Sequence, residues 1–169
     1  MTSAIVQDLR RQADSAWSRL GRLLDGMDAN LDRADTPGEW TVREVLSHLL
    51  GADDPNLLDL VRSASRRDYP RIEFQPADTA LTPAREAMSL AELLGALDRQ
   101  RRDVIAYVES LPEADLAERK LRIPLFKEFM GTEEVSIAML LGAMIDFHWN
   151  DHASQLAKIR KAVGLPPAP

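Results

Sequence analysis

Hydrophobic side chains recur with a period of about 3.6 residues in four stretches of this chain, and that period is typical of packed α-helices. The first stretch covers residues 5–27, and the second begins at Thr41. The third covers residues 89–111, and the fourth runs from about Thr132 to a stop at Gly164. Four amphipathic helices predict an all-α fold, a four-helix bundle with long crossover connections.

Two of these helices have strongly marked first turns. The Thr41 hydroxyl can cap the second helix while Glu44 reaches back to the Thr41 amide, and Trp40 can pack on the first turn as a hydrophobic staple. Ser89 and Glu92 repeat the same spacing at the start of the third helix. We therefore expect both helices to begin at these positions.

The remaining boundaries rest on weaker signals. Pro55 must interrupt or restart the second helix, with Asp54 as a candidate new cap. Glu133 and Glu134 would lie in the first turn of the fourth helix, where the helix dipole favours negative charge. Residues 66–88 and 112–131 show no sustained period, so we expect irregular connections there, and long loops in compact domains are often functional.

The chain contains only three histidines, His48, His148 and His152, and each lies on or beside a predicted buried stripe. His148 and His152 are four residues apart on one helix, so they share a face and can offer two imidazole nitrogens to one cation. Burial of an imidazole costs roughly 1–3 kcal/mol per unsatisfied group. A metal ion shared with His48 would satisfy these nitrogens. Hydrogen-bonded core histidines are the alternative interpretation.

Several other metal and catalytic sites are excluded by particular residues. The zinc protease motif needs Glu directly after its first histidine, and Trp149 occupies that place. The repeated Glu-x-x-His pairs of di-iron bundles, the serine hydrolase elbow and the phosphate-binding glycine loops do not occur. Because the chain has no cysteine, disulfides, thiolate ligands and a cysteine nucleophile are also excluded. Three imidazoles suit Zn, Ni, Fe or Cu and leave a coordination position open.

Composition narrows the partners and the location. A chain of 169 residues suits one domain covering 1–169. The net charge is −6 and no basic face is evident, which disfavours nucleic acid as a partner. The apolar runs are shorter than the ~20 residues of a membrane-spanning helix. Residues 1–11 lack the features of a secretory signal, so we expect a cytoplasmic protein.

Two motifs resemble those of the DinB-like (DinB/YfiT) metalloenzyme family. The first, W-[ST]-x-x-x-[VI]-x-x-H-L, is filled by Trp40, Thr41, Val45, His48 and Leu49. The second, H-x-x-x-H-x-x-Q-[LI], is filled by His148, His152, Gln155 and Leu156. Many relatives carry His or Arg and then Gly after the last of these histidines, whereas this chain has Ala153 and Ser154. The resemblance covers nearly the whole chain and implies a four-helix bundle, often dimeric, that holds one divalent metal ion.

The resemblance also implies a chemistry. Characterised members include S-transferases and isomerases that use mycothiol or bacillithiol, so we expect a thiol-dependent enzyme that acts on small electrophiles. Its cofactor would be a divalent ion (Zn, Ni or Fe), its cosubstrate a low-molecular-weight thiol, and its assembly a homodimer. A metal-activated hydrolase, and a noncatalytic protective protein with a ClbS-like role, are the alternatives.

Further residues near the motifs are candidates for supporting roles. Gln155 and Glu44 lie where they can orient imidazoles, although the capping role is the stronger interpretation for Glu44. Trp149 and Asn150 can border the pocket or lie at a surface or dimer contact. We expect Asp151 to be solvated on the flank of the helix.

Overall fold

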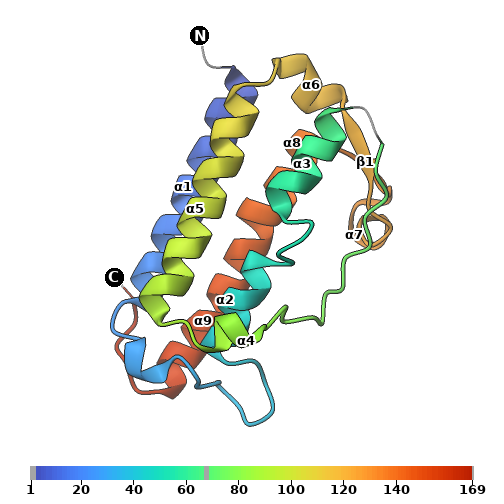
Figure 1. The fold of residues 1–169 in the computed structure, drawn as a ribbon. Coiled ribbons are helices and arrows are strands. Elements are labelled where there is room, and N and C mark those ends of the chain that lie inside the picture. Colours follow the sequence, from blue (N-terminus) through green and yellow to red (C-terminus); the bar gives the residue numbers. More distant parts are fainter. Residues whose placement is uncertain (1–2, 67–68, 169) are drawn as a thin grey trace.

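The computed structural model describes residues 3–66 and 69–168, which form mostly helices with one short two-stranded ribbon (Figure 1). In chain order the elements are α1 (Ala4–Leu24), the 3-10 turn η1 (Asp28–Asn30), α2 (Val42–Leu50), α3 (Leu57–Ser65), α4 (Pro83–Glu86), α5 (Leu90–Glu109), α6 (Glu113–Glu118), β1 (Lys120–Arg122), α7 (Phe126–Met130), β2 (Glu134–Ser136), α8 (Ile137–Leu141), the π-helical segment η2 (Gly142–Phe147) and α9 (His148–Ala162).

The long helices pack as a four-helix bundle, as the hydrophobic period predicts. α1 packs on α5 and on α9, and α2 packs on α5 and on α9, so that α2 and α9 lie side by side (Figure 1). Their facing sides carry fully buried residues, among them Leu20, Leu46, Leu97 and Leu156. None of the helices in the described part of the chain is long and apolar enough to cross a membrane.

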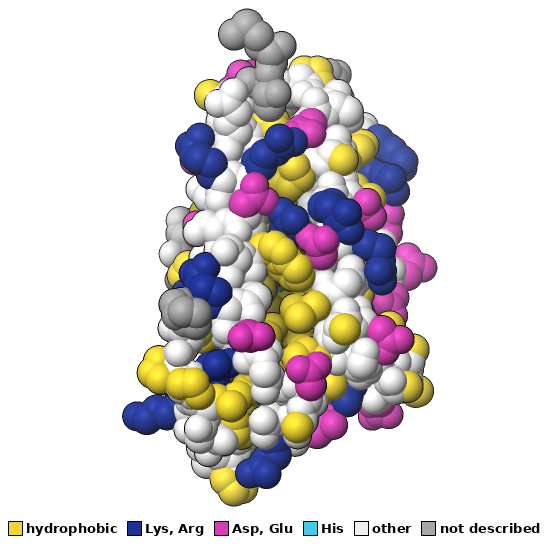
Figure 2. All heavy atoms as spheres, turned by 90° about the vertical axis from the view of Figure 1, so that its left-hand side faces the viewer, with side chains coloured by type: hydrophobic (Ala, Val, Ile, Leu, Met, Phe, Trp, Pro, Cys, Tyr) yellow, Lys and Arg dark blue, Asp and Glu magenta, His cyan; other side chains and the backbone are white. Residues whose placement is uncertain are grey.

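The surface on the α1 and α5 side carries both signs of charge. Figure 2 shows a central strip of hydrophobic atoms on this face, flanked by acidic and basic side chains. Ion pairs join the two helices, with Arg10 bound to Glu109 and Arg101 bound to Asp14. The positive charges on this face are therefore interspersed with negative ones.

The predicted first turn of the second helix is confirmed. The Glu44 amide donates to the Thr41 hydroxyl oxygen at 3.2 Å, and the Thr41 amide donates to a Glu44 carboxylate oxygen at 2.8 Å. Ser89 and Glu92 form the same capping box on α5. Because these contacts join residues only three positions apart, they can be recognised locally.

The restart after Pro55 uses a different cap from the one predicted. Asn56, not Asp54, precedes the first turn of α3 and forms a capping box with Asp59. Asp54 lies in the turn between α2 and α3, and its bond to Pro55 is cis. The described part of the crossover, residue 66 and residues 69–88, contains only the short α4 as a helix, while residues 67–68 lie outside the described residues.

The predicted start of the fourth helix at Thr132 is wrong. The helix begins at Ile137, where the hydroxyl oxygen of Ser136 accepts the Met139 amide at 3.2 Å. The residues before it form β2, which pairs antiparallel with β1. Val135 in β2 and Leu121 in β1 are paired and fully buried, so tertiary packing outweighs the helical preference of this segment.

Glu133 and Glu134, which the sequence predicts in the first turn of that helix, bind basic residues of β1 instead. Glu133 accepts from Arg122 at 2.8 Å, and Glu134 accepts from Lys120 at 2.5 Å. These pairs join β1 to the segment that precedes α8.

The π-helical segment η2 interrupts the last helix directly before His148. The His148 amide donates to the carbonyl of Ala143, five residues earlier, so this turn is one residue wider than an α-turn. After it, Trp149 and Ala153 occupy the buried face, at 2 % and 0 % exposure. His148 and His152 are therefore half-buried beside the core and do not occupy the core stripe that the sequence predicts.

We predict that Thr41→Ala lowers the free energy of unfolding by about 1 kcal/mol, because the side-chain cap of the α2 amides is lost. Denaturant unfolding measures this. The matched control is Thr36→Ala, which changes an exposed threonine in the loop before α2 and is expected to have little effect. An equal loss in both variants would contradict the capping role.

Candidate metal centre

The structure brings the three histidines together at the contact between α2 and α9. The ring centroids of His48, His148 and His152 lie 4.7–4.9 Å apart in all three pairs. One nitrogen from each ring lies within 4.8 Å of the others, and all three residues are half-buried. The juxtaposition predicted from the sequence is thus present, although one hundred residues separate His48 from His148.

Two of the rings are oriented by hydrogen bonds from their outer nitrogens. His48 Nδ1 lies 2.6 Å from the carbonyl oxygen of Asp78, and His152 Nδ1 lies 2.9 Å from the Gln155 side-chain oxygen. Because both oxygens only accept, each Nδ1 carries the proton. In the neutral rings the lone pairs are consequently on Nε2, the arrangement in which outer partners present histidines to a metal ion.

One ring nitrogen of His148 lies in the protein interior. Its Nε2 lies 2.9 Å from His48 Nε2, and its Nδ1 is buried without a hydrogen-bond partner in the described structure. Burial is the main cause that lowers the pKa of His148 to about 3, with smaller contributions from His152 and His48. The carbonyl of Met144 opposes the shift weakly.

Burial also lowers the pKa of His48. The hydrogen bond to the Asp78 carbonyl opposes this shift, and the neighbouring His152 adds to it. Both His48 and His148 are therefore uncharged at neutral pH, the state in which an imidazole binds a metal ion.

Trp40 forms an aromatic wall beside two of the histidines. Its ring stacks on His152, with centroids 5.9 Å apart and planes 7° apart, and it lies tilted on His48 at 4.8 Å. The sequence predicts Trp40 as a hydrophobic staple for the first turn of α2, and its place against the histidines was missed. The position of Trp in the first family motif is the signal that could have found it.

Of the other predicted supporting residues, one contacts a histidine and three have structural roles elsewhere. Gln155 holds His152, as predicted, whereas the Glu44 carboxylate caps α2. Trp149 is in the core beside Trp17 and does not border the site. Asn150 binds Arg19 of α1 through its side-chain oxygen at 2.9 Å, so it joins α9 to α1.

Two aspartates near the histidines have different places: Asp151 faces solvent, and Asp78 contacts His48. Asp151 is exposed on α9, as expected. Asp78 was not predicted, because it contributes a backbone carbonyl, which every residue has, and because the irregular crossover gives no periodicity from which its position could be inferred.

The donor set fits a divalent transition metal. Two Nε2 atoms face each other at 2.9 Å, and among the described residues no carboxylate belongs to the group. Three neutral nitrogen donors suit Zn, Ni or Fe and leave at least one coordination position for another molecule. An ion shared by the rings would also satisfy nitrogens whose burial is otherwise costly.

Comparison with known proteins agrees with this geometry. The sequence profile of the DinB superfamily matches residues 12–156. The Bacillus subtilis (strain 168) protein YuaE, which is uncharacterized, is 27% identical over 159 residues, covering 87% of this chain and 91% of YuaE. The structure of YfiT from Bacillus subtilis is similar with a TM-score of 0.69 and 19% identity, over 98% of this chain and 92% of YfiT. YfiT is described as "a probable metal-dependent hydrolase with an unusual four-helix bundle topology".

We predict that the metal-free protein becomes less stable as the pH falls from about 6.5 towards about 3. In this window the unfolded chain takes up a proton on His148 and the folded protein does not, so acid favours unfolding. At about pH 5, His148 lowers the free energy of unfolding by on the order of 1–2 kcal/mol relative to pH 7, after allowance for solvent screening.

Denaturant unfolding in a chelator, measured near pH 7 and near pH 5, tests this dependence. His148→Asn is expected to lose less stability between pH 7 and pH 5, because it lacks the ring that takes up a proton in this range only after unfolding. An identical loss in both proteins would show that burial does not depress the pKa of His148.

Proposed function

Because the chain belongs to the DinB superfamily, we propose that His48, His148 and His152 bind one divalent metal ion and that the protein is a metal-dependent enzyme acting on a small molecule. The observation that carries the proposal is the orientation of the rings. Two Nδ1 protons are held by outer oxygens, and the Nε2 atoms of His48 and His148 face each other. This arrangement presents lone pairs to a common centre.

The charge of the donor set favours an anionic partner for the ion. Three neutral imidazoles leave the full positive charge of a divalent ion uncompensated, which lowers the pKa of a thiol or a water molecule that binds there. A thiol has an intrinsic pKa near 8.5, far below that of water. A smaller lowering of its pKa therefore gives the anionic nucleophile at neutral pH.

A low-molecular-weight thiol is therefore the cosubstrate that we propose, and a thiol-dependent S-transfer or isomerisation of a small electrophile is the reaction. The chain has no cysteine, so the sulfur must come from another molecule. Trp40 would place an apolar wall beside the reacting groups and exclude water from one side of the site.

A metal-activated hydrolase is the second candidate. The description of YfiT as a probable metal-dependent hydrolase favours it, although at 19% identity the likeness of YfiT to this chain shows the fold alone. The same three histidines would serve this reaction, with water as the nucleophile.

The wider setting stays a prediction. We propose zinc, nickel or iron as the ion, a homodimer as the assembly, and the cytoplasm as the location. A small-molecule substrate suits the half-buried site, and the net charge of −6 disfavours nucleic acid.

The metal centre is tested by titrating the chelator-treated protein with Zn²⁺ or Co²⁺ in a calorimeter. We expect one ion per chain, and an affinity that falls by about 100-fold or more in His148→Ala, since one of three donors is lost. The matched control is Asp151→Ala, which changes an exposed residue between the two histidines of α9 and is expected to bind the ion normally. Equal affinity in all three proteins would refute the site.

The reaction class is tested by supplying the metal-loaded protein with a model electrophile such as chlorodinitrobenzene, with and without mycothiol or bacillithiol. We expect consumption of the electrophile only when the thiol is present, and a rate about 100-fold lower in His148→Ala, because the ion supplies several kcal/mol of stabilisation. Asp151→Ala should react as the unmodified protein does.

Other results would point elsewhere. Turnover of an ester or amide panel without any thiol would favour the hydrolase. Ligand binding that survives in His148→Ala without turnover of either kind would favour a noncatalytic protective protein.

A further inference from the structure

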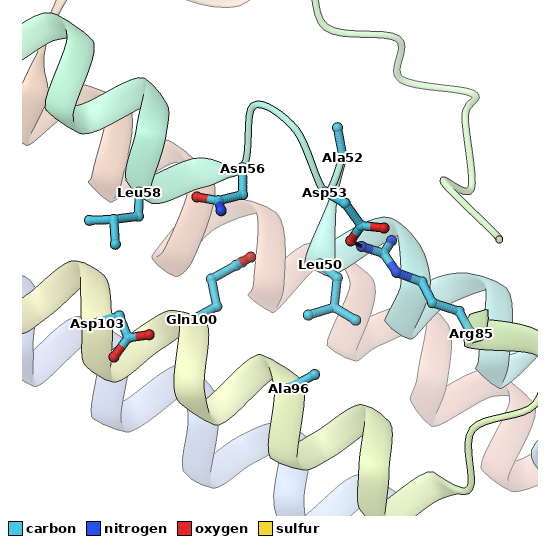
Figure 3. A pocket seen from close by; sticks show the side chains of 9 residues that line it. All are labelled: Leu50, Ala52, Asp53, Asn56, Leu58, Arg85, Ala96, Gln100 and Asp103. Carbon is cyan, nitrogen blue, oxygen red and sulfur yellow. Dashed lines mark hydrogen bonds and ion pairs between the residues drawn. The ribbon is translucent and has the colours of Figure 1, made fainter.

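A buried arginine contacts Ser47, the residue directly before His48. Arg85 belongs to the short helix α4 in the crossover and is 5 % exposed. Figure 3 shows its guanidinium reaching from α4 to the carboxylate of Asp53, in the loop that follows α2, where the two residues form part of the wall of a cavity of about 180 Å³. A buried charge of this kind is costly unless its donors are bonded, so its partners show what it does.

The partners of Arg85 are mainly backbone oxygens on two separate segments. Nη1 lies 3.0 Å from the Ser47 carbonyl and 2.7 Å from the Gly51 carbonyl, both at the end of α2. The same nitrogen lies 3.0 Å from the carbonyl of Ala80 in the crossover, so its two protons are shared among oxygens of both segments. The side chain of Asp53 is 71 % exposed, so solvent screens its ion pair with Arg85. The bonds to the carbonyls, which join the crossover to α2, therefore contribute most of the stabilisation of the buried guanidinium.

The crossover segment that Arg85 holds is the one that orients His48. The Ala80 amide donates to the side-chain oxygen of Asp78 at 2.8 Å, and the carbonyl of Asp78 accepts from His48 Nδ1 at 2.6 Å. Ala80 has a φ of 51°, a left-handed conformation that costs an alanine about 1–2 kcal/mol. Such a turn persists only where its surroundings hold it, and the bond from Arg85 to the Ala80 carbonyl does so.

Arg85 thus binds two groups next to His48: the residue before it in α2 and the 78–80 turn that contacts its ring. On one side it contacts Ser47, the residue directly before His48, through both the carbonyl and the hydroxyl oxygen. On the other side it holds the turn whose carbonyl receives the His48 proton.

We propose that Arg85 is a positioning residue that fixes the orientation of His48 and the ring nitrogen that carries its proton. The importance of this for metal binding rests on the proposed function, whereas the effect on His48 itself does not. Without the Arg85 guanidinium, the 78–80 turn is no longer held in place. The His48 ring then loses its fixed acceptor, and its proton is found on either Nδ1 or Nε2.

The test compares Arg85→Met with a matched control, Arg160→Met. Arg160 is also a buried arginine, 6 % exposed, and it donates to the carbonyls of Leu23, Asp25 and Pro166, none of which contacts a histidine. Both variants remove a buried guanidinium bonded to carbonyls, so both should lose stability. Only the first should alter His48.

Two readouts are needed. Proton–nitrogen correlation spectra of the imidazole rings in the metal-free protein report which nitrogen of His48 is protonated, with His48→Asn assigning the signals. We expect a single tautomer protonated at Nδ1 in the unmodified protein and in Arg160→Met, and an averaged mixture in Arg85→Met. Titration with Co²⁺, followed by its visible absorption, should show roughly tenfold weaker binding in Arg85→Met alone.

The outcomes separate the two proposals. Unchanged His48 signals in Arg85→Met, or equal changes in Arg160→Met, overturn the role of Arg85. Failure of the unmodified protein to bind Co²⁺ overturns the proposed metal centre, and the His48 signals still decide on Arg85. If Arg85→Met does not fold, Arg85→Gln decides in its place, because the shorter amide side chain keeps a polar end but lacks the Nη1 atom that contacts α2 and the 78–80 turn.

Discussion

The arrangement of the candidate site depends on three imidazoles that pack against one another, two of which burial keeps uncharged. Burial penalises a proton on His48 and His148, so both rings stay neutral, and a neutral ring has one donor and one acceptor nitrogen. The structure uses the donor nitrogens of His48 and His152 for bonds to protein oxygens. The acceptor nitrogens are left for the centre of the cluster.

The parts of the fold that could be predicted from the sequence are those set by contacts between near neighbours. The capping boxes at Thr41 and Ser89 join residues three positions apart, and the stripes of the long helices repeat every turn. The spacing of His148 and His152 belongs to the same category. The meeting of these two with His48 could be inferred because no other histidine is available and because two motifs resemble a known family.

The parts that could not be predicted depend on contacts between distant segments. The ribbon displaces the start of the last helix because Val135 finds a buried place beside Leu121, which no local preference of either segment indicates. Asp78 serves through a backbone oxygen, and Arg85 serves through bonds to other backbone oxygens. Such contacts leave no signature in residue type or spacing, so they are visible only once the chain is folded.

The wide turn formed by η2 decides which side of α9 faces α2. An α-helix rotates by about 100° for each residue, so one residue more or fewer changes which side of the following helix faces inwards. The extra residue in η2 sets the phase at which His148 and His152 leave that turn and meet α2. The wide turn absorbs this residue, so a chain shorter by one residue within 142–147 would form an uninterrupted α-helix that still presents the histidine pair to His48. What would turn the histidines away from α2 is the closing of this turn at constant length, because the helix after it would then rotate by about 100°.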